Sequence, residues 1–202
     1  MKLEQTNRII IKIGSALLFN ETSGSLNKEW LNSLAEDVKY LRENDKEVII
    51  VSSGAIAMGA KDLDLDMKNM KMDMNQAVSA VGQIHLMGSF KSAFEKNEIK
   101  ISQILLTLDD TEQRRRSINA RRTIDTLLKL GIVPVVNEND TIATSEIRYG
   151  DNDRLASRVA QITSADCLIL LSNINGLYSA DPSTDEDVKL INKVSEIDNN
   201  SI

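Results

Sequence analysis

The stretch RIIIKIG, residues 8–14, sets the expectation for the whole fold. It is short, consists largely of β-branched isoleucine, is apolar on both alternating faces and ends at a glycine. This pattern is typical of a strand that is buried on both faces of a parallel sheet. Four further segments repeat the pattern, and we expect a strand in each of them: 47–54, 101–107, 131–137 and 166–172.

Helical patterns alternate with these strands, with apolar side chains recurring every three or four positions. We expect helices over 27–44, 75–96, 110–130 and 153–163. The alternation predicts an α/β fold: a three-layer αβα sandwich around a mainly parallel, doubly wound sheet, formed as a single domain by residues 1–202.

Three local signals refine this fold. Asp109 and Asp110 are candidate caps for the helix over 110–130. Pro134 places its strand at a sheet edge or marks the beginning of the strand. Residues 141–150 alternate in polarity and contain no helix signal, so we expect a β-hairpin there.

Composition excludes several classes of protein. The chain is 42% hydrophobic with a net charge of −6, which argues against a main role in binding nucleic acid or an anionic membrane. No apolar run approaches the ~20 residues that span a bilayer. The single cysteine, Cys167, excludes an internal disulfide, and the arginines of RRRSINARR, 114–122, are interpreted as a solvated helix face. We therefore expect a cytoplasmic protein with neither a nucleic-acid nor a membrane partner.

The unusual polar residues follow the predicted strands. Parallel α/β sheets bind ligands at the carboxyl ends of their strands, so these residues should gather at one ligand-binding edge. They are Lys12 with Gly14 and Ser15, residues 52–54, residues 137–140, and Ser172 with Asn173.

Lys12 interrupts an isoleucine strand, so its ammonium group must either reach water or meet an anion. The glycine two positions later, Gly14, allows the backbone to approach a ligand closely, and the N–H groups that follow can bind an anion. A phosphate group would fit beside Lys12.

Two clusters of acid and amide, NEND at 137–140 and GDND at 150–153, flank the predicted hairpin. Asp140 only accepts hydrogen bonds when ionised and suits an ammonium group. Residues 151–153 have an alternative interpretation as helix caps. Together the clusters favour a small zwitterionic substrate next to a nucleotide.

Two familiar ligand motifs are not present. SSGAIAMGA, 52–60, resembles a phosphate-binding P-loop, but Ala60 stands where the lysine is required. DLDLD, 62–66, resembles the beginning of a calcium loop, but Met67 replaces the required glycine. We expect no metal ion to be bound by the protein itself.

Several segments together resemble the amino acid kinase superfamily and, within it, the glutamate 5-kinase family. They cover nearly the whole chain in the expected order: IIIKIGSALL, EVIIVSSGAIAMG, QAVSAVGQ, QILLT, the long segment from NARRTIDTLL to GDNDRLAS, and ADCLILLSNINGLYSADP. The resemblance implies transfer of the ATP γ-phosphoryl group to the side-chain carboxylate of L-glutamate, the first step of proline biosynthesis. ATP would carry Mg²⁺ on its phosphates, proline would be a feedback inhibitor, and the protein would be a homo-oligomer.

The resemblance also implies roles for individual residues. Lys12 would act on the transferring phosphate, and Asp153 would organise that lysine. Glutamate would be bound by Ser53, Asp140 and Asn152. The nucleotide would lie beside Lys12, Gly14, Ser172 and Asn173, although Ser172-Asn173 departs from the Thr-Asp pair that is common in the family.

The family's glycine-rich GTGGM loop, whose lysine helps to hold ATP, has no counterpart in the chain, which ends at Ile202. We therefore expect a kinase domain that is incomplete at its C-terminus, with weak ATP binding and poor turnover. The alternative function is a catalytically incomplete protein of the same fold that binds glutamate or proline.

Overall fold

The computed structural model describes residues 3–20, 24–68, 70–143, 151–182, 184 and 188–195. The chain divides into two compact units, residues 1–171 and residues 172–202.

A parallel sheet of five strands, counted over the described residues, forms the centre of the first unit. The strands are β1 (Arg8–Ile13), β2 (Glu47–Ser52), β3 (Ile101–Leu106), β4 (Val133–Glu138) and β5 (Cys167–Leu171). Their spatial order is β3-β4-β2-β1-β5, so the first strand lies inside the sheet. All five predicted strands are therefore confirmed, and so is the parallel arrangement.

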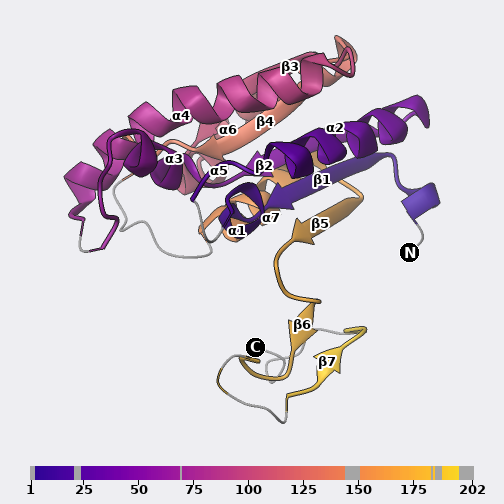
Figure 1. Ribbon diagram of the computed structural model, residues 1–202. Coiled ribbons are helices and arrows are strands. Elements are labelled where there is room, and N and C mark those ends of the chain that lie inside the picture. The colour runs from indigo at the N-terminus through magenta and orange to yellow at the C-terminus, as the bar shows by residue number, and fades with distance from the viewer. Residues whose placement is uncertain are drawn as a thin grey trace. The chain divides into compact units, whose positions relative to one another are not determined.

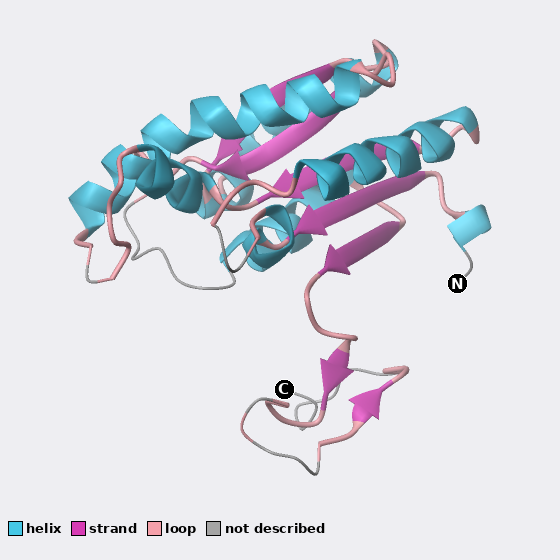
Figure 2. Ribbon diagram, in the orientation of Figure 1, coloured by secondary structure: helices cyan, strands magenta, loops and turns pink. Residues whose placement is uncertain are grey.

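Helices cover both faces of this sheet and complete the three layers (Figures 1 and 2). One layer contains α2 (Lys28–Glu43), α3 (Ala55–Asp62) and α4 (Met72–Glu95), and the other contains α5 (Leu108–Glu112), α6 (Arg114–Lys129) and α7 (Asp151–Thr163). A short 3₁₀ helix (Leu3–Gln5) precedes β1, and α1 (Ser15–Leu18) follows it.

Successive residues of β1 pack against opposite layers, which explains its unbroken apolar sequence. Ile9, Ile11 and Ile13 belong to the core between the sheet and α2 and α4. Ile10 belongs to the core on the opposite face, together with Ile124 of α6 and others. All four isoleucines are at most 4% exposed.

Two details of the expected helices are corrected. The predicted helix over 110–130 is divided at Gln113, whose backbone is extended (φ −72°, ψ 113°), into α5 and α6. The N-cap of α5 is Thr107, which exchanges hydrogen bonds with Asp110 in a capping box. Asp110 thus stabilises the beginning of the helix from its third position.

Pro134 is the second residue of β4, which lies between β3 and β2. The expectation that proline marks the beginning of its strand is confirmed, and the alternative of an edge strand is wrong. The expected hairpin at 141–150 lies largely outside the described residues. Only its first residues are described, and there Ala143 donates a backbone hydrogen bond to Asn139 in a turn.

Helices α3 and α4 approach each other closely because each has a glycine at the crossing. A Cβ atom added to Gly59 would lie 1.9 Å from the Val78 carbonyl oxygen, and one added to Gly82 would lie 1.9 Å from that of Ala55. The crossing therefore fixes α3, which begins directly after β2, against α4.

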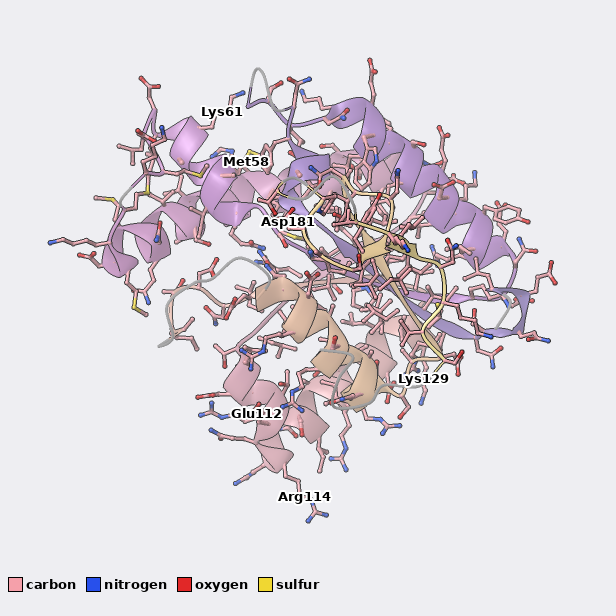
Figure 3. The ribbon with its side chains drawn as sticks, turned by 90° about the horizontal axis from the view of Figure 1, so that it is seen from below. Met58, Lys61, Glu112, Arg114, Lys129 and Asp181 are labelled. Atoms are coloured by element: carbon pink, nitrogen blue, oxygen red, sulfur yellow. The ribbon has the colours of Figure 1, made fainter. Side chains whose placement is uncertain are left out.

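The arginines of α6 all lie at its exposed surface, which confirms the solvated-face interpretation of residues 114–122. Figure 3 shows Arg114 pointing outward at the beginning of the helix. Arg116 pairs with Asp110 at 2.9 Å, and Arg121 with Asp125 at 3.6 Å.

The second unit contains a small antiparallel pair of strands, β6 (Leu177–Tyr178) and β7 (Leu190–Ile191). Across the described part of the chain, no helix combines the length and the apolar character that crossing a membrane requires.

Candidate functional site

Several predicted site residues of the first unit lie at the carboxyl ends of three neighbouring strands, and two others, Asn152 and Asp153, lie in the first turn of α7. Gly14 follows β1, Ser53 follows β2, and Asp140 lies two residues beyond β4. Because β1, β2 and β4 are adjacent and parallel, these ends share one edge of the sheet. The structure thus brings together segments that are far apart in the sequence.

Lys12 pairs with an anion at this edge. Its Nζ lies 2.6 Å from Asp153 Oδ1, and its side chain is only 13% exposed. The two charges are in contact without the alignment of a good hydrogen bond. Asp153 lies in the first turn of α7, where the helix dipole favours a carboxylate. The ammonium group of Lys12 therefore does not extend into solvent. Of the two alternatives that the sequence left open for it, water or an anion, the structure shows the anion.

Gly14 leaves space beside this lysine. Its backbone is extended (φ −71°, ψ 148°), a conformation that any residue can adopt. An added Cβ would lie 3.4 Å from the Leu171 carbonyl oxygen and 3.9 Å from Lys12 Nζ. These are ordinary van der Waals distances, so neither a clash nor backbone strain requires glycine here, and its effect is to leave open space beside the Lys12 ammonium group. Its own N–H group is bound to the Leu171 carbonyl oxygen.

The connection from β2 to α3 requires glycine for two reasons, its backbone conformation and the closeness of a neighbouring side chain. Gly54 has a φ of +101°, and an added Cβ would lie 2.7 Å from the ring of Phe19. Ser53, directly before it, is half-buried, and its carbonyl oxygen accepts a hydrogen bond from the Ser52 hydroxyl at 3.1 Å. The sharp bend places Ser53 at the edge of the sheet.

Asp140 is buried, and its carboxylate accepts a hydrogen bond from the hydroxyl group of Ser79 on α4. Three residues earlier, Asn137 Nδ2 donates to Gln83 Oε1 at 2.7 Å. The sequence interpretation did not single out Ser79 or Gln83. The available signal was their spacing of four residues on a helix face that continues with the apolar Leu86 and Phe90.

Asn152 lies in the first turn of α7 next to Asp153. Its carboxamide oxygen is buried and accepts no hydrogen bond from any described residue. An N-cap side chain would be bound to the backbone N–H groups of its own helix, so capping does not account for Asn152. A buried oxygen without a hydrogen-bond partner lowers the stability of the folded protein, unless a bound ligand donates a hydrogen bond to it. Nothing is described of the Asp151 side chain.

Ser172 and Asn173 belong to the second unit. Both are exposed, and Ser172 Oγ donates to Asn173 Oδ1 at 3.4 Å. Their expected contact with a nucleotide stays a prediction.

A cavity of about 230 Å³ adjoins Asp140. It is lined by residues of α4, by Gln103 and Leu105 of β3, and by the segment after β4. A larger open groove of about 500 Å³ lies between α2 and α4 and contains none of the predicted site residues. Within the described ranges, no three His, Cys, Asp or Glu residues are grouped as metal ligands.

Comparison with known proteins identifies the family. The model of a family described as "Amino acid kinase family" matches residues 7–201. The chain belongs to the amino acid kinase family. Two solved members of this fold resemble it: the T. acidophilum isopentenyl phosphate kinase (TM-score 0.60, 16% identity, 90% of this chain and 77% of that one) and the UMP kinase from Bacillus anthracis (TM-score 0.59, 14% identity, 92% and 72%). At these identities the likeness establishes the amino acid kinase fold.

Two curated relatives within the amino acid kinase family are much more similar in sequence. The protein named "Glutamate 5-kinase" in Pelagibacter ubique (strain HTCC1062) is 58% identical over 98% of this chain and 54% of its own length. The one of the same name in Ruegeria sp. (strain TM1040) is 52% identical over 96% of this chain and 53% of its own length. The chain spans about half the length of the curated relatives that it matches.

Proposed function

We propose that the protein takes part in the ATP-dependent phosphorylation of the side-chain carboxylate of L-glutamate, which yields L-glutamyl 5-phosphate in the first step of proline biosynthesis. The observation that carries the proposal is the placement of the buried Asp140 carboxylate and the Lys12–Asp153 pair at one edge of a parallel sheet. The similarity to proteins named glutamate 5-kinase supports it.

The phosphate side of the proposed site is formed by Lys12 and Gly14. The ammonium group of Lys12 is held in place by Asp153, and the missing side chain of Gly14 leaves space for a phosphate group next to it. ATP supplies the phosphoryl group, and Mg²⁺ arrives on its phosphates. The task of Lys12 is to oppose the negative charge that spreads over the transferring oxygens, for which a preorganised cation is effective.

The glutamate side is formed by Asp140, Ser53 and Asn152. The buried Asp140 carboxylate receives the α-ammonium group of the substrate. The hydroxyl of Ser53 and the amide N–H₂ of Asn152 donate hydrogen bonds to the substrate carboxylates. The buried carboxamide oxygen of Asn152 is an acceptor that the substrate ammonium group can satisfy.

This chemistry requires no general base. The side-chain carboxyl group of free glutamate has a pKa near ~4.3, so the attacking oxygen is ionised at neutral pH. What the protein must supply is in-line positioning and positive charge. The residues gathered at the sheet edge match these two requirements.

The proposal extends to the organisation of the protein. Residues 1–202 belong to one amino acid kinase domain, and the protein acts in the cytoplasm and assembles as a homo-oligomer. Proline binds in competition with glutamate. The test is an inhibition assay at increasing glutamate concentration, in which inhibition that glutamate cannot relieve would contradict competition.

The activity is tested by two measurements on the same preparation. Titration calorimetry measures the binding of L-glutamate and of ATP with Mg²⁺, and a coupled assay measures ADP release with L-glutamate against L-aspartate, which is one methylene shorter. ADP release that depends on L-glutamate supports the kinase. Glutamate binding without nucleotide binding supports the alternative of a catalytically incomplete binding protein, and the binding of neither ligand rejects both functions.

A further inference from the structure

Three polar side chains on one face of α4 hold the end of β4 and the segment that follows it. Gln76 Nε2 donates to the Ala143 carbonyl oxygen at 3.0 Å, the Ser79 hydroxyl donates to Asp140 Oδ2, and Gln83 Oε1 accepts from Asn137 Nδ2 at 2.7 Å. We call these three residues (Gln76, Ser79 and Gln83) the α4 polar stripe. Their spacing of three and four residues matches one helix face, and their partners are spaced every three residues.

The α4 polar stripe is unusual because it is largely buried. Ser79 and Gln83 are buried, in a helix whose other buried residues include Leu86 and Phe90. Burying polar groups is unfavourable unless each finds a partner, and apolar side chains would pack here without that requirement. The stripe therefore specifies one position of the 137–143 segment relative to α4.

The helix that carries the α4 polar stripe is itself fixed. Gly82, next to Gln83, lies in the tight crossing with α3, where an added Cβ would meet the backbone nitrogen of Gly59 at 2.4 Å. Helix α3 begins directly after Ser53 and Gly54. Through α4, the Ser53 end of β2 and the Asp140 end of β4 are thus attached to one rigid element.

We propose that Ser79 is a positioning residue that orients Asp140 toward the α-ammonium group of the substrate and so selects amino acids over dicarboxylates that lack this group. The inference rests on the proposed function. The hydrogen bond from the buried Ser79 hydroxyl restrains the orientation of the Asp140 carboxylate, and its attraction for a cation then depends on where that cation lies. Without the Ser79 hydroxyl, Asp140 loses one of the interactions that orient its carboxylate, and the ammonium group meets a less well placed partner.

The experiment measures the dissociation constants of L-glutamate and of glutarate, which has both carboxylates but no amino group, by titration calorimetry. The variants are Ser79→Ala and a matched control on the same helix, Ser92→Ala, whose exposed hydroxyl donates to the Gly88 carbonyl oxygen at 2.9 Å. Ser79→Ala is expected to weaken L-glutamate binding on the order of tenfold and to leave glutarate binding unchanged. Ser92→Ala is expected to leave both constants unchanged.

Thermal unfolding of each variant verifies that it folds. If Ser79→Ala does not fold, the nearly isosteric Ser79→Cys, with its weak donor, carries the same expectation. Equal weakening of L-glutamate and glutarate, or no weakening of either, overturns the role of Ser79 while the proposed function stands. A wild-type protein that binds no L-glutamate overturns the proposed function and the positioning role with it.

Discussion

Lys12 Nζ lies 2.6 Å from Asp153 Oδ1, a contact that joins the interior strand β1 to the first turn of α7. The lysine side chain is 13% exposed and the aspartate side chain 46%, so the ion pair has a shielded cationic end and a more open anionic end. Asp153 therefore restrains the ammonium group from the side of α7. In the proposed reaction this leaves Lys12 fixed next to the space beside Gly14.

In a preparation that turns over L-glutamate, Lys12→Ala is expected to lower kcat by ~10²–10³, because one preorganised charge that acts on the transition state is removed. The dissociation constant of L-glutamate should change little, since Lys12 faces the phosphate side of the proposed site. Steady-state kinetics and calorimetry measure the two effects. Lys91→Ala, on an exposed part of α4, is the control, and a fall in kcat of less than about threefold for Lys12→Ala would refute the role.

Asp140→Ala is expected to raise the L-glutamate KM about tenfold to a hundredfold, because the α-ammonium group loses a charged hydrogen bond of ~1.5–3 kcal/mol. The ATP dissociation constant should stay the same. Both are obtained from titrations in which one ligand is varied. A change in ATP affinity with unchanged glutamate affinity would mean that Asp140 belongs to the nucleotide side.

The alternating strands and helices were predictable because each carries its own period in the sequence. The isoleucines of β1 contact the cores on both faces of the sheet. An uninterrupted apolar sequence therefore indicates a strand that is buried on both faces. The division at Gln113 was not predictable from period alone. Glu112 and Arg114, on either side of it, are compatible with a helix, and no glycine or proline stands there as a stop signal, so the sequence does not mark the division.

The site was predictable in part for a similar reason. Lys12 and Asp140 stand out as charged residues at the ends of apolar strands, and the rule for parallel sheets brings them to one edge. Ser79 and Gln83 do not stand out in this way, because serine and glutamine are common on the exposed surfaces of helices. Only the packing of α4 against β4 shows that they are buried and bound to Asp140 and Asn137.

Asp166→Asn is expected to destabilise the protein at pH 7 but not at low pH. The Asp166 carboxylate accepts hydrogen bonds from the backbone N–H groups of Arg8 and Asn7 at 2.8 and 2.7 Å, and these bonds lower its pKa. A lowered pKa in the folded state contributes stability above the unfolded pKa of about 3.9, and this contribution is lost as the pH falls through the folded pKa. Urea unfolding from pH 7 to pH 3 should therefore show the two proteins converging.

The control for this pH dependence is Asp37→Asn, which removes the same charge from the exposed face of α2. It should change the free energy of unfolding little at any pH in the series. A difference between wild type and Asp166→Asn that stays constant from pH 7 to pH 3 would show that the carboxylate charge is not responsible.

Gly82→Ala is expected to destabilise the fold, whereas Gly88→Ala on the same helix should stabilise it. At position 82 the added Cβ would lie 1.9 Å from the Ala55 carbonyl oxygen and 2.4 Å from the Gly59 nitrogen. Both are backbone atoms of α3, so the two helices must separate, with a loss of about 1–3 kcal/mol typical of an overpacked core. At position 88 nothing lies within 4 Å of the added Cβ, and replacing a helical glycine by alanine typically gains about 0.4–1 kcal/mol.

Urea denaturation of both variants measures these opposite changes in the free energy of unfolding. Both substitutions replace glycine by alanine in the same helix, so the change in helix propensity is the same. The difference between the two variants therefore measures the steric effect at the contact between α3 and α4. Since α3 begins directly after Ser53 and Gly54, and α4 holds Asp140, separation of the helices should also weaken L-glutamate binding in Gly82→Ala but not in Gly88→Ala. A Gly82→Ala protein as stable as wild type would show that α3 and α4 can shift apart without loss, and that their close approach does not fix the sheet edge.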